Sequence, residues 1–263
     1  QILGVPADDE PRMLQLTQEF FGAQDPELTR DKEAFEKRDV AAGLAAMQGV
    51  LADFFQYFTE MTHNRRANPT DDVATVIANG QIDGQPIGEF EAMSYYVIVA
   101  AAGHDTTSAS TAGGMLAMLQ TPDALAKMMA DPKAHSRTCV DEAIRWTTPV
   151  KHFMRTAQSD YELRGRKILK GESLMLNYPS GNRDEDVFED PYTFKVDRSP
   201  NRLISFGYGG HMCLGMHLAR MEMMALYEEL FSRVKSIELA GEPTYISANF
   251  VGGPKSIPVR YTF

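Results

Sequence analysis

Cysteine is scarce in this sequence, with only Cys139 and Cys213 among 263 residues. Two cysteines cannot build a disulfide framework, which excludes a small disulfide-stabilised scaffold and is typical of a protein of the reducing cytoplasm. Blocks of basic residues are lacking too, and the formal net charge of −10 argues against a nucleic-acid partner. No apolar run approaches the length of a membrane-spanning helix, and the first residues do not form a signal peptide, so no membrane association is expected.

What the sequence does contain, over its first half, is apolar residues at every third or fourth position, the spacing of amphipathic helices. Helices are predicted over residues 8–21, 39–61, 73–78, 124–130 and 132–146. The charged and poorly periodic residues 24–38 are predicted to be a mobile connection. The longest predicted helix covers residues 88–120, contains no proline and would span roughly 50 Å at 1.5 Å per residue.

After Pro149 the pattern changes to short strands separated by Asp, Gly and Ser turns. Strands are predicted over residues 150–156, 161–163, 166–168, 173–178, 237–239, 245–251 and 257–262. A polar, proline-containing loop, residues 182–201, lies between the two groups of strands. The expected fold class is therefore mainly α with small β-sheets (α+β), as a single domain over residues 1–263.

A glycine-rich stretch with one cysteine, residues 206–215, precedes a predicted helix over 216–231. Glycines allow left-handed backbone and a close approach to a flat ligand. A cysteine at the mouth of a helix is near the positive end of the helix dipole, which favours the thiolate. A thiolate held beneath glycine backbone is suited to ligate a haem iron from one side.

This stretch also allows three other interpretations: a buried cysteine, a phosphate-binding loop and a zinc site. A lone cysteine is commonly a small buried apolar residue. A phosphate-binding loop is disfavoured, because Gly207 and Gly209 are not followed by the third glycine or by a Lys-Ser/Thr pair. A structural zinc site is disfavoured because His211, Cys213 and His217 would supply only three ligands of the usual four.

Polar residues interrupt the long predicted helix where its apolar character predicts burial. Asp105 and Thr106 follow a stretch of small and apolar residues, and burying an acid beside hydroxyls costs several kcal/mol unless partners or water meet them. Hydroxyls bonding back to the preceding turn would be one explanation. A ligand lying against the helix, to which protons must be delivered, is the other. His104 is not expected to be a metal ligand.

Glu142 and Arg145 stand three residues apart on one face of a predicted helix. Taken alone, such a pair is commonly a surface ion pair of little energetic value. Its position between the Asp105–Thr106 segment and the cysteine loop favours a structural role instead.

Four blocks in this order resemble the cytochrome P-450 superfamily, the haem-thiolate monooxygenases: Asp105-Thr106, Glu142-x-x-Arg145, the segment ending at Arg198, and the cysteine loop. The resemblance covers nearly all of the chain. Residues 140–151 and 249–255 are similar to the bacterial terpineol-oxidising members of the family. Because family members are longer, the resemblance implies that an N-terminal third is absent from this chain.

The resemblance implies haem b as cofactor and assigns roles by position. Cys213 matches the proximal iron ligand, and Asp105 and Thr106 match the catalytic acid–alcohol pair that delivers protons during oxygen activation. Residues 88–120 match the long helix on the distal side of the haem, and residues 206–231 match the ligand loop with its following helix. Glu142, Arg145 and Arg198 match a buried ionic group behind that loop. The further cofactor-binding positions are His211, Arg155, Phe206, Gly207, Gly209, Gly215 and Ala102. The positions matching the substrate pocket are Ile98, Ala101, Ala102, Val150, Phe153, Phe250 and Val251; core packing explains each of these equally well.

The implied reaction inserts one oxygen atom of O₂ into a C–H bond of a small hydrophobic substrate, either a monoterpenoid or an aromatic hydrocarbon. Because no flavin or iron–sulfur motif is present, the expected partners are a two-iron ferredoxin and an NAD(P)H-dependent ferredoxin reductase. A cytoplasmic monomer is expected. The alternatives are a haem-thiolate protein that uses peroxide or acts as an isomerase or dehydratase, and a haem sensor without turnover.

Overall fold

The computed structural model describes residues 2–263, which divide into two compact units. The first unit contains residues up to Thr106 together with Ile246–Asn249, and the second contains Thr107–Tyr245 and Phe250–Phe263. The single domain expected from the sequence stays a prediction. Within residues 2–263, no helix combines the length and the apolar character that crossing a bilayer requires.

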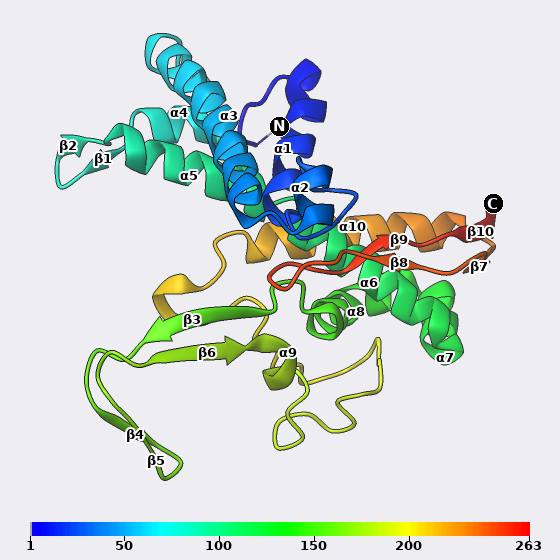
Figure 1. The fold of residues 1–263 in the computed structure, drawn as a ribbon. Coiled ribbons are helices and arrows are strands. Elements are labelled where there is room, and N and C mark those ends of the chain that lie inside the picture. The colour runs from blue at the N-terminus through cyan, green and yellow to red at the C-terminus, as the bar shows by residue number, and fades with distance from the viewer. Residues whose placement is uncertain (1) are drawn as a thin grey trace. The chain divides into compact units, whose positions relative to one another are not determined.

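The first unit is built mainly of helices (Figure 1). Its elements are a 3₁₀ turn at Ala7–Asp9, α1 (Glu10–Phe21), α2 (Lys32–Lys37), α3 (Val40–Ala67), α4 (Val73–Ala78), the short antiparallel pair β1 (Gln81–Ile82) and β2 (Gln85–Pro86), and α5 (Glu89–Ala102). Asp31, Asp39 and Asp72 cap the starts of α2, α3 and α4, each accepting a hydrogen bond from the backbone N–H three residues on.

The core of this unit contains stacked aromatic rings among aliphatic side chains. The rings of Phe54 and Phe58 in α3 are parallel at 6.0 Å, and Phe58 stacks on Tyr96 of α5 at 4.8 Å. The Tyr96 hydroxyl donates to the carbonyl of Ala74 at 2.9 Å, so its polar end is satisfied where its ring is buried. This contact fixes α5, the helix that precedes Asp105, against α3 and α4.

Two sequence predictions are wrong in this region. Residues 24–38 contain α2, which starts at the Asp31 cap, so the segment is not simply an irregular connection. Residues 88–120 do not form one helix: α5 ends at Ala102 and α6 (Asp105–Gln120) begins after a turn at Gly103 and His104. The Thr106 hydroxyl donates to the carbonyl of Ala102 at 2.7 Å, and such back-bonding bends helices, here beside a glycine that forms helix poorly.

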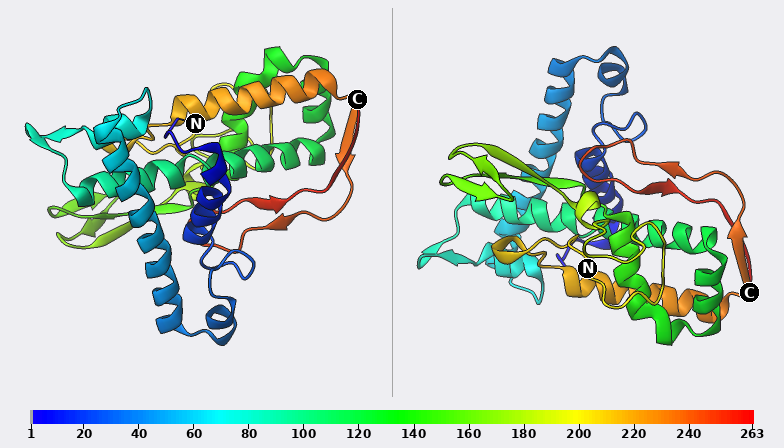
Figure 2. Two further views of the ribbon diagram at one scale, coloured as in Figure 1. Left: turned by 90° about the horizontal axis from the view of Figure 1, so that it is seen from above. Right: turned by 90° about the horizontal axis from the view of Figure 1, so that it is seen from below.

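The second unit combines a helical layer with small antiparallel sheets (Figure 2). Its helices are α6 from Thr107 onward, α7 (Pro122–Ala130), α8 (Pro132–Thr147), α9 (Tyr178–Gly181) and α10 (Met216–Arg233), with a 3₁₀ turn at Gly209–His211. Its strands are β3 (His152–Thr156), β4 (Tyr161–Leu163), β5 (Arg166–Ile168), β6 (Ser173–Asn177), β7 (Ser236–Leu239), β8 (Thr244–Tyr245), β9 (Pro254–Ser256) and β10 (Val259–Thr262).

The strands pair as β3–β6, β4–β5, β7–β10 and β8–β9, all antiparallel. In β3–β6, His152 lies opposite Asn177 and Thr156 opposite Ser173. The predicted strand over residues 245–251 is wrong in extent, since only Tyr245 belongs to a strand and Val251 forms a single bridge to Val150. The residues between them, Ile246–Asn249, belong to the first unit and bond to side chains there, as the Ser247 N–H does to Asp25.

Close helix packing places α10, which follows the cysteine loop, against α6 and α8. Gly114 allows this approach, because an added Cβ would lie 2.3 Å from Ala143 and 2.5 Å from the Tyr227 hydroxyl. Tyr227 is fully buried and donates to the carbonyl of Thr111 at 2.7 Å. The core around these helices is apolar and includes the second cysteine of the chain, Cys139.

Candidate active site

The Cys213 loop has the backbone shape that its glycines predict. Gly207 and Gly209 both have φ of +71°, a region that other residues rarely adopt. The backbone N–H of Cys213 donates to the carbonyl of Phe206 at 2.8 Å, which closes the loop just before α10 begins. The loop is thus a defined turn with the cysteine near the N-terminus of a long helix.

One face of this loop is open and largely apolar. Cys213 is exposed, and its neighbours Tyr208 and Leu214 are 92% and 94% exposed. A Cβ added at Gly209, Gly210 or Gly215 would meet no atom of the described residues within 4 Å. A single thiol beside glycine backbone and exposed apolar side chains fits a large, flat, apolar ligand with one metal to bind, which is the chemistry of haem.

Behind the loop, Phe206 is held by charged residues of the neighbouring helices. The Arg220 guanidinium of α10 lies 4.6 Å from the Phe206 ring centre, a cation–π distance. Arg220 also donates from Nε to Asp141 of α8 at 2.7 Å. The ring that starts the loop is therefore connected to both α10 and α8.

Glu142, Arg145 and Arg198 come together in the structure as a buried ionic cluster. Arg145 binds the Glu142 carboxylate with two bonds, of 2.7 Å from Nε and 2.8 Å from its second nitrogen. Arg198 donates from Nε to the same carboxylate at 2.9 Å. Glu142 and Arg145 are completely buried and Arg198 nearly so. The carboxylate also accepts from Asn201 and from the backbone N–H of Lys195.

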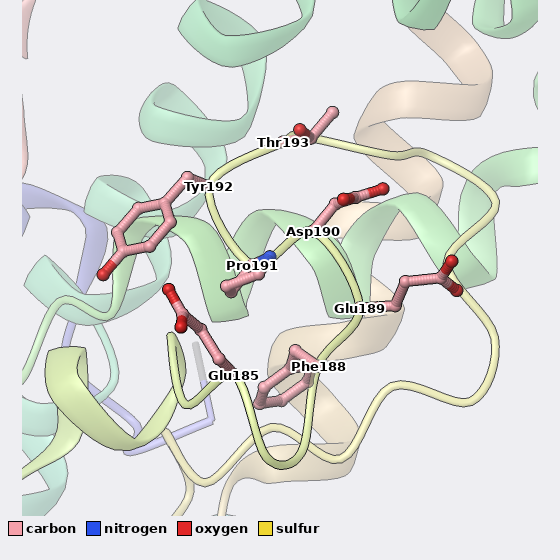
Figure 3. Close-up of a pocket in the computed structure, with 7 residues that line it drawn as sticks. All are labelled: Glu185, Phe188, Glu189, Asp190, Pro191, Tyr192 and Thr193. Atoms are coloured by element: carbon pink, nitrogen blue, oxygen red, sulfur yellow. The ribbon is translucent and has the colours of Figure 1, made fainter.

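Most of the remaining donors of these arginines bind carbonyls of one loop, residues 185–193 (Figure 3), and Arg145 also donates to the carbonyl of Asn182 at 2.8 Å. Arg145 donates to the carbonyl of Pro191, and Arg198 donates to those of Glu189, Asp190 and Thr193, at 2.7–3.0 Å. The loop surrounds a surface hollow of about 440 Å³ that contains none of the predicted site residues. The cluster therefore fixes irregular backbone that has no sheet or helix to satisfy its carbonyls.

Two basic residues that the resemblance assigns to cofactor binding, Arg155 and His211, have no acidic partner within residues 2–263. The Arg155 guanidinium on β3 donates to the carbonyl of Met154 at 2.9 Å, with no ion pair to a carboxylate. The His211 side chain is exposed in the 3₁₀ turn of the cysteine loop. Basic side chains without an acidic partner are suited to donate hydrogen bonds to the propionates of haem, and this is a second feature of the unit that fits haem.

Asp105 and Thr106 open α6 at the turn described above. Asp105 Oδ1 lies 3.1 Å from Nδ1 of His104, whereas Asp105 Oδ2 is buried and has no hydrogen-bond partner among the described residues. The carboxylate raises the pKa of His104 above its ordinary value through this hydrogen bond, against a smaller opposing effect of burial. The acid–alcohol pair is thus accompanied by an imidazole that sequence reasoning set aside.

Similarity to known proteins agrees with this geometry. A family model described as Cytochrome P450 matches residues 136–249, which include the ionic cluster and the cysteine loop. Cytochrome P450-terp of a Pseudomonas species is 48% identical over 262 residues, which is 99% of this chain and 60% of that protein. This chain belongs to the cytochrome P450 family.

Solved cytochrome P450 structures have the same fold. CYP108D1 from Novosphingobium aromaticivorans is 49% identical with a TM-score of 0.85, covering 100% of this chain and 59% of that one. Mycobacterium marinum CYP268A2, solved with pseudoionone, is 33% identical with a TM-score of 0.89, covering 98% of this chain and 60% of that one.

Among the relatives similar in sequence, the steroid C26-monooxygenase of Mycolicibacterium smegmatis is 34% identical, covering 100% of this chain and 58% of that protein. The chain thus spans about 60% of these relatives, and the predicted mainly α fold with small sheets is confirmed.

The positions that match the P450 substrate pocket differ in exposure. Ile98 is 56% exposed and Ala102 is also exposed in the first unit, whereas Ala101 is buried there. In the second unit, the rings of Phe153 and Phe250 lie 5.4 Å apart, edge to face. Ala101 and Val251 are almost completely buried, as expected for residues that pack in a core.

Sequence reasoning missed several residues of this P450 that the structure places at the predicted sites. Asn182 donates to the hydroxyls of Thr148 and Ser205, and so connects the end of α8 to the segment before the cysteine loop. Asn201 joins the ionic cluster, and His104 pairs with Asp105. The two asparagines lie in the stretch without periodicity, where the only available signal was a polar side chain between prolines. His104 did stand directly beside a predicted acid.

Proposed function

We propose that the protein is a haem-thiolate monooxygenase, with haem b ligated by Cys213, that hydroxylates a small hydrophobic substrate. The observation that carries the proposal is the exposed thiol of Cys213 on an open glycine loop whose first ring, Phe206, contacts Arg220. When bound, haem with a thiolate ligand supplies the oxygen activation that lets one atom of O₂ enter a C–H bond.

When haem is bound, Cys213 would hold the iron through Sγ, and the loop around it would set the position of that atom. The left-handed Gly207 and Gly209 allow the backbone to pass beneath the thiol without a Cβ at these positions. The Arg220–Phe206 contact and the bond of Cys213 N–H to Phe206 limit the motion of Sγ. His211, which is exposed, and Arg155, which is partly exposed and also donates to the carbonyl of Met154, would donate to the haem propionates.

Asp105 and Thr106 supply protons to the reaction. The free oxygen of Asp105 can give and take a proton. The oxygen of the Thr106 hydroxyl can accept a hydrogen bond from a water while the hydroxyl donates to the carbonyl of Ala102. The two residues therefore have different roles. Asp105 sets the rate at which protons are delivered. Thr106 determines whether the delivered proton leads to hydroxylated product or to hydrogen peroxide.

The substrate is a small apolar molecule, a monoterpenoid or an aromatic hydrocarbon. Support comes from the apolar positions Ile98, Phe153 and Phe250, and from the relatives named for apolar molecules, the pseudoionone complex and the steroid C26-monooxygenase. Electrons come from a two-iron ferredoxin and an NAD(P)H-dependent reductase, since the chain has no motif for a second redox cofactor. The protein acts as a cytoplasmic monomer.

The test is the absorption spectrum of the haem-loaded, reduced protein under carbon monoxide. Thiolate ligation gives a Soret band at markedly longer wavelength than histidine ligation, so this spectrum reports the ligand directly. A spectrum typical of histidine ligation, or failure to bind haem, would reject the assignment. Formation of hydroxylated product from NADH and O₂ then separates the monooxygenase from a peroxide-using enzyme, an isomerase, a dehydratase or a sensor.

A further inference from the structure

His104 and Asp105 form a pair whose two members differ in their access to solvent. The His104 side chain is 44% exposed, whereas that of Asp105 is 12% exposed. Nδ1 of His104 contacts only one carboxylate oxygen, Oδ1, at 3.1 Å. The other oxygen, Oδ2, is buried and without a partner among residues 2–263. The carboxylate therefore has one side toward an exposed imidazole and the other toward the interior.

The charge environment of this pair is simple. Within the described residues, Asp105 is the one charged group that shifts the pKa of His104, and it raises that pKa by hydrogen bonding and by its charge. Histidine ordinarily titrates near 6.5, so an upward shift keeps much of the imidazole protonated near neutral pH. A protonated, exposed imidazole in contact with a buried acid is suited to carry protons from water.

We infer that His104 is a positioning residue that supplies Asp105 with protons from solvent and leaves Oδ2 as the oxygen that delivers them. This inference rests on the proposed monooxygenase function. The Nδ1 proton of the imidazolium passes to Oδ1, which leaves a neutral imidazole and a carboxylic acid. The carboxyl group then rotates, so that the protonated oxygen takes the buried position of Oδ2 and the proton is delivered from there. The exposed imidazole ring turns to solvent and takes up one proton, which restores the pair of imidazolium and carboxylate. Protons and charge balance over the cycle, and no oxidant or reductant takes part in it.

The experiment compares His104→Gln with the parent, using haem-loaded protein, its electron donors and a substrate that is turned over. Gln keeps a hydrogen-bond donor beside Asp105 but cannot titrate. We expect the NADH oxidation rate to fall on the order of ten-fold, because general acid catalysis is worth at least that much, with product per NADH maintained. The loss of rate with rising pH that the parent shows above the pKa of His104 should vanish. His63→Gln, a change at an exposed histidine of α3, is the matched control and should leave rate and pH profile unchanged.

Two further measurements distinguish this role from a structural one. In Asp105→Asn, the His104→Gln change should lower the rate no further, because both residues serve one path. An NMR titration should show the pKa of His104 above its ordinary value in the parent and lower in Asp105→Asn, whatever the activity. Parental rate and pH profile in His104→Gln, or equal losses in His63→Gln, would overturn the inference. Loss of the thiolate spectrum in the parent would instead reject the proposed function.

Discussion

The second unit contains two charged or reactive groups that differ in how completely the protein satisfies them. In the ionic cluster of Glu142, Arg145 and Arg198, the buried carboxylate and both guanidinium groups are bound by protein atoms. In the Cys213 loop, the thiol and the apolar side chains beside it face outward, and three glycines have open space where a Cβ would stand. The charged groups of the cluster are bound by protein atoms, whereas the thiol and apolar side chains of the loop are open to a ligand.

The difference suggests a division of tasks along a short stretch of chain. A buried ion pair contributes little net stability relative to apolar packing, but losing one partner is costly. Such a group specifies one backbone arrangement, here the loop at residues 185–193 that leads toward Cys213. The exposed loop can then be presented in a single shape, which is what a ligand site requires. Substitutions in the cluster should therefore lower folding stability, whereas substitutions in the Cys213 loop should remove ligand binding and leave the fold intact.

The largest effect is expected at Cys213. Cys213→Ala should abolish thiolate-ligated haem and with it all oxygenation, while the apoprotein keeps the fold, because Sγ supports nothing else in the structure. Cys139→Ala is the control: Cys139 is buried beside Met118, and burial raises the pKa of its thiol to about 12, so it is no candidate ligand. The carbon monoxide spectrum checks both. A thiolate band that survives in Cys213→Ala and disappears in Cys139→Ala would reverse the assignment.

Next in size is the ionic cluster, where the failure should be one of folding. Glu142→Ala leaves two guanidinium groups without their buried carboxylate, and we expect a loss of about 3–5 kcal/mol in the free energy of unfolding. Haem uptake should fall with it. Asp141→Ala, one residue away, removes a partly exposed partner of Arg220 and should cost under about 1 kcal/mol. Denaturant unfolding measures both.

A Glu142→Ala protein that is stable, takes up haem and differs only in the position it hydroxylates would contradict the structural role. It would also remove the contrast between the two regions, since the cluster would then act on the substrate.

How far the sequence predicts these groups depends on how local their information is. Glu142 and Arg145 share a helix face, so their pairing follows from a spacing of three residues. Arg198 could be matched to them only through the family resemblance, and the carbonyls that the arginines bind lie in a loop with no periodicity. The break at Gly103 was not predicted, because helical patterning continues across it and the hydroxyl of Thr106 competes only in three dimensions.

A moderate effect is expected at Thr106. Its polar side chain is partly buried, and so lies between the buried ionic cluster and the exposed thiol of Cys213. Thr106→Ala removes a hydroxyl but keeps a good helix former, so fold and substrate binding should survive. Product per NADH should fall about three- to ten-fold, the order of a lost proton-delivery contact, with hydrogen peroxide appearing instead. Thr111→Ala is a matched control, since Thr111 bonds back to Thr107 as Thr106 does to Ala102.

Equal losses in Thr106→Ala and Thr111→Ala would attribute the effect to helix geometry rather than to proton delivery. Normal coupling in Thr106→Ala, with a loss in Thr107→Ala, would assign the alcohol to the next residue. Asp105→Asn should act differently from either, slowing NADH oxidation itself.

The smallest effect is expected at Lys151, a partly buried cation that, among the described residues, has carbonyl partners but no carboxylate. Its Nζ donates to the carbonyls of Thr147 and Thr148 at 3.0 and 2.8 Å, and burial together with the charge of Arg183 lowers its pKa from the ordinary 10.5 to about 8. Between pH 8 and 10.5 the unfolded chain therefore holds a proton that the folded chain has released, so stability should rise with pH across this window. The rise should be on the order of 1–2 kcal/mol once solvent screening is allowed for.

Lys151→Met should remove this rise while costing the two hydrogen bonds, and Lys167→Met, at an exposed lysine of β5, should leave it as in the parent. Chemical unfolding at pH 7.5, 8.5 and 9.5, below the range in which tyrosines ordinarily ionise, measures the difference. Parallel pH curves for Lys151→Met and the parent would show that Lys151 is as well satisfied by carbonyls as the cluster arginines are by Glu142. In that case a buried cation would not need a carboxylate to be fully satisfied. The contrast between the ionic cluster and the Cys213 loop would then rest only on the exposure of Cys213.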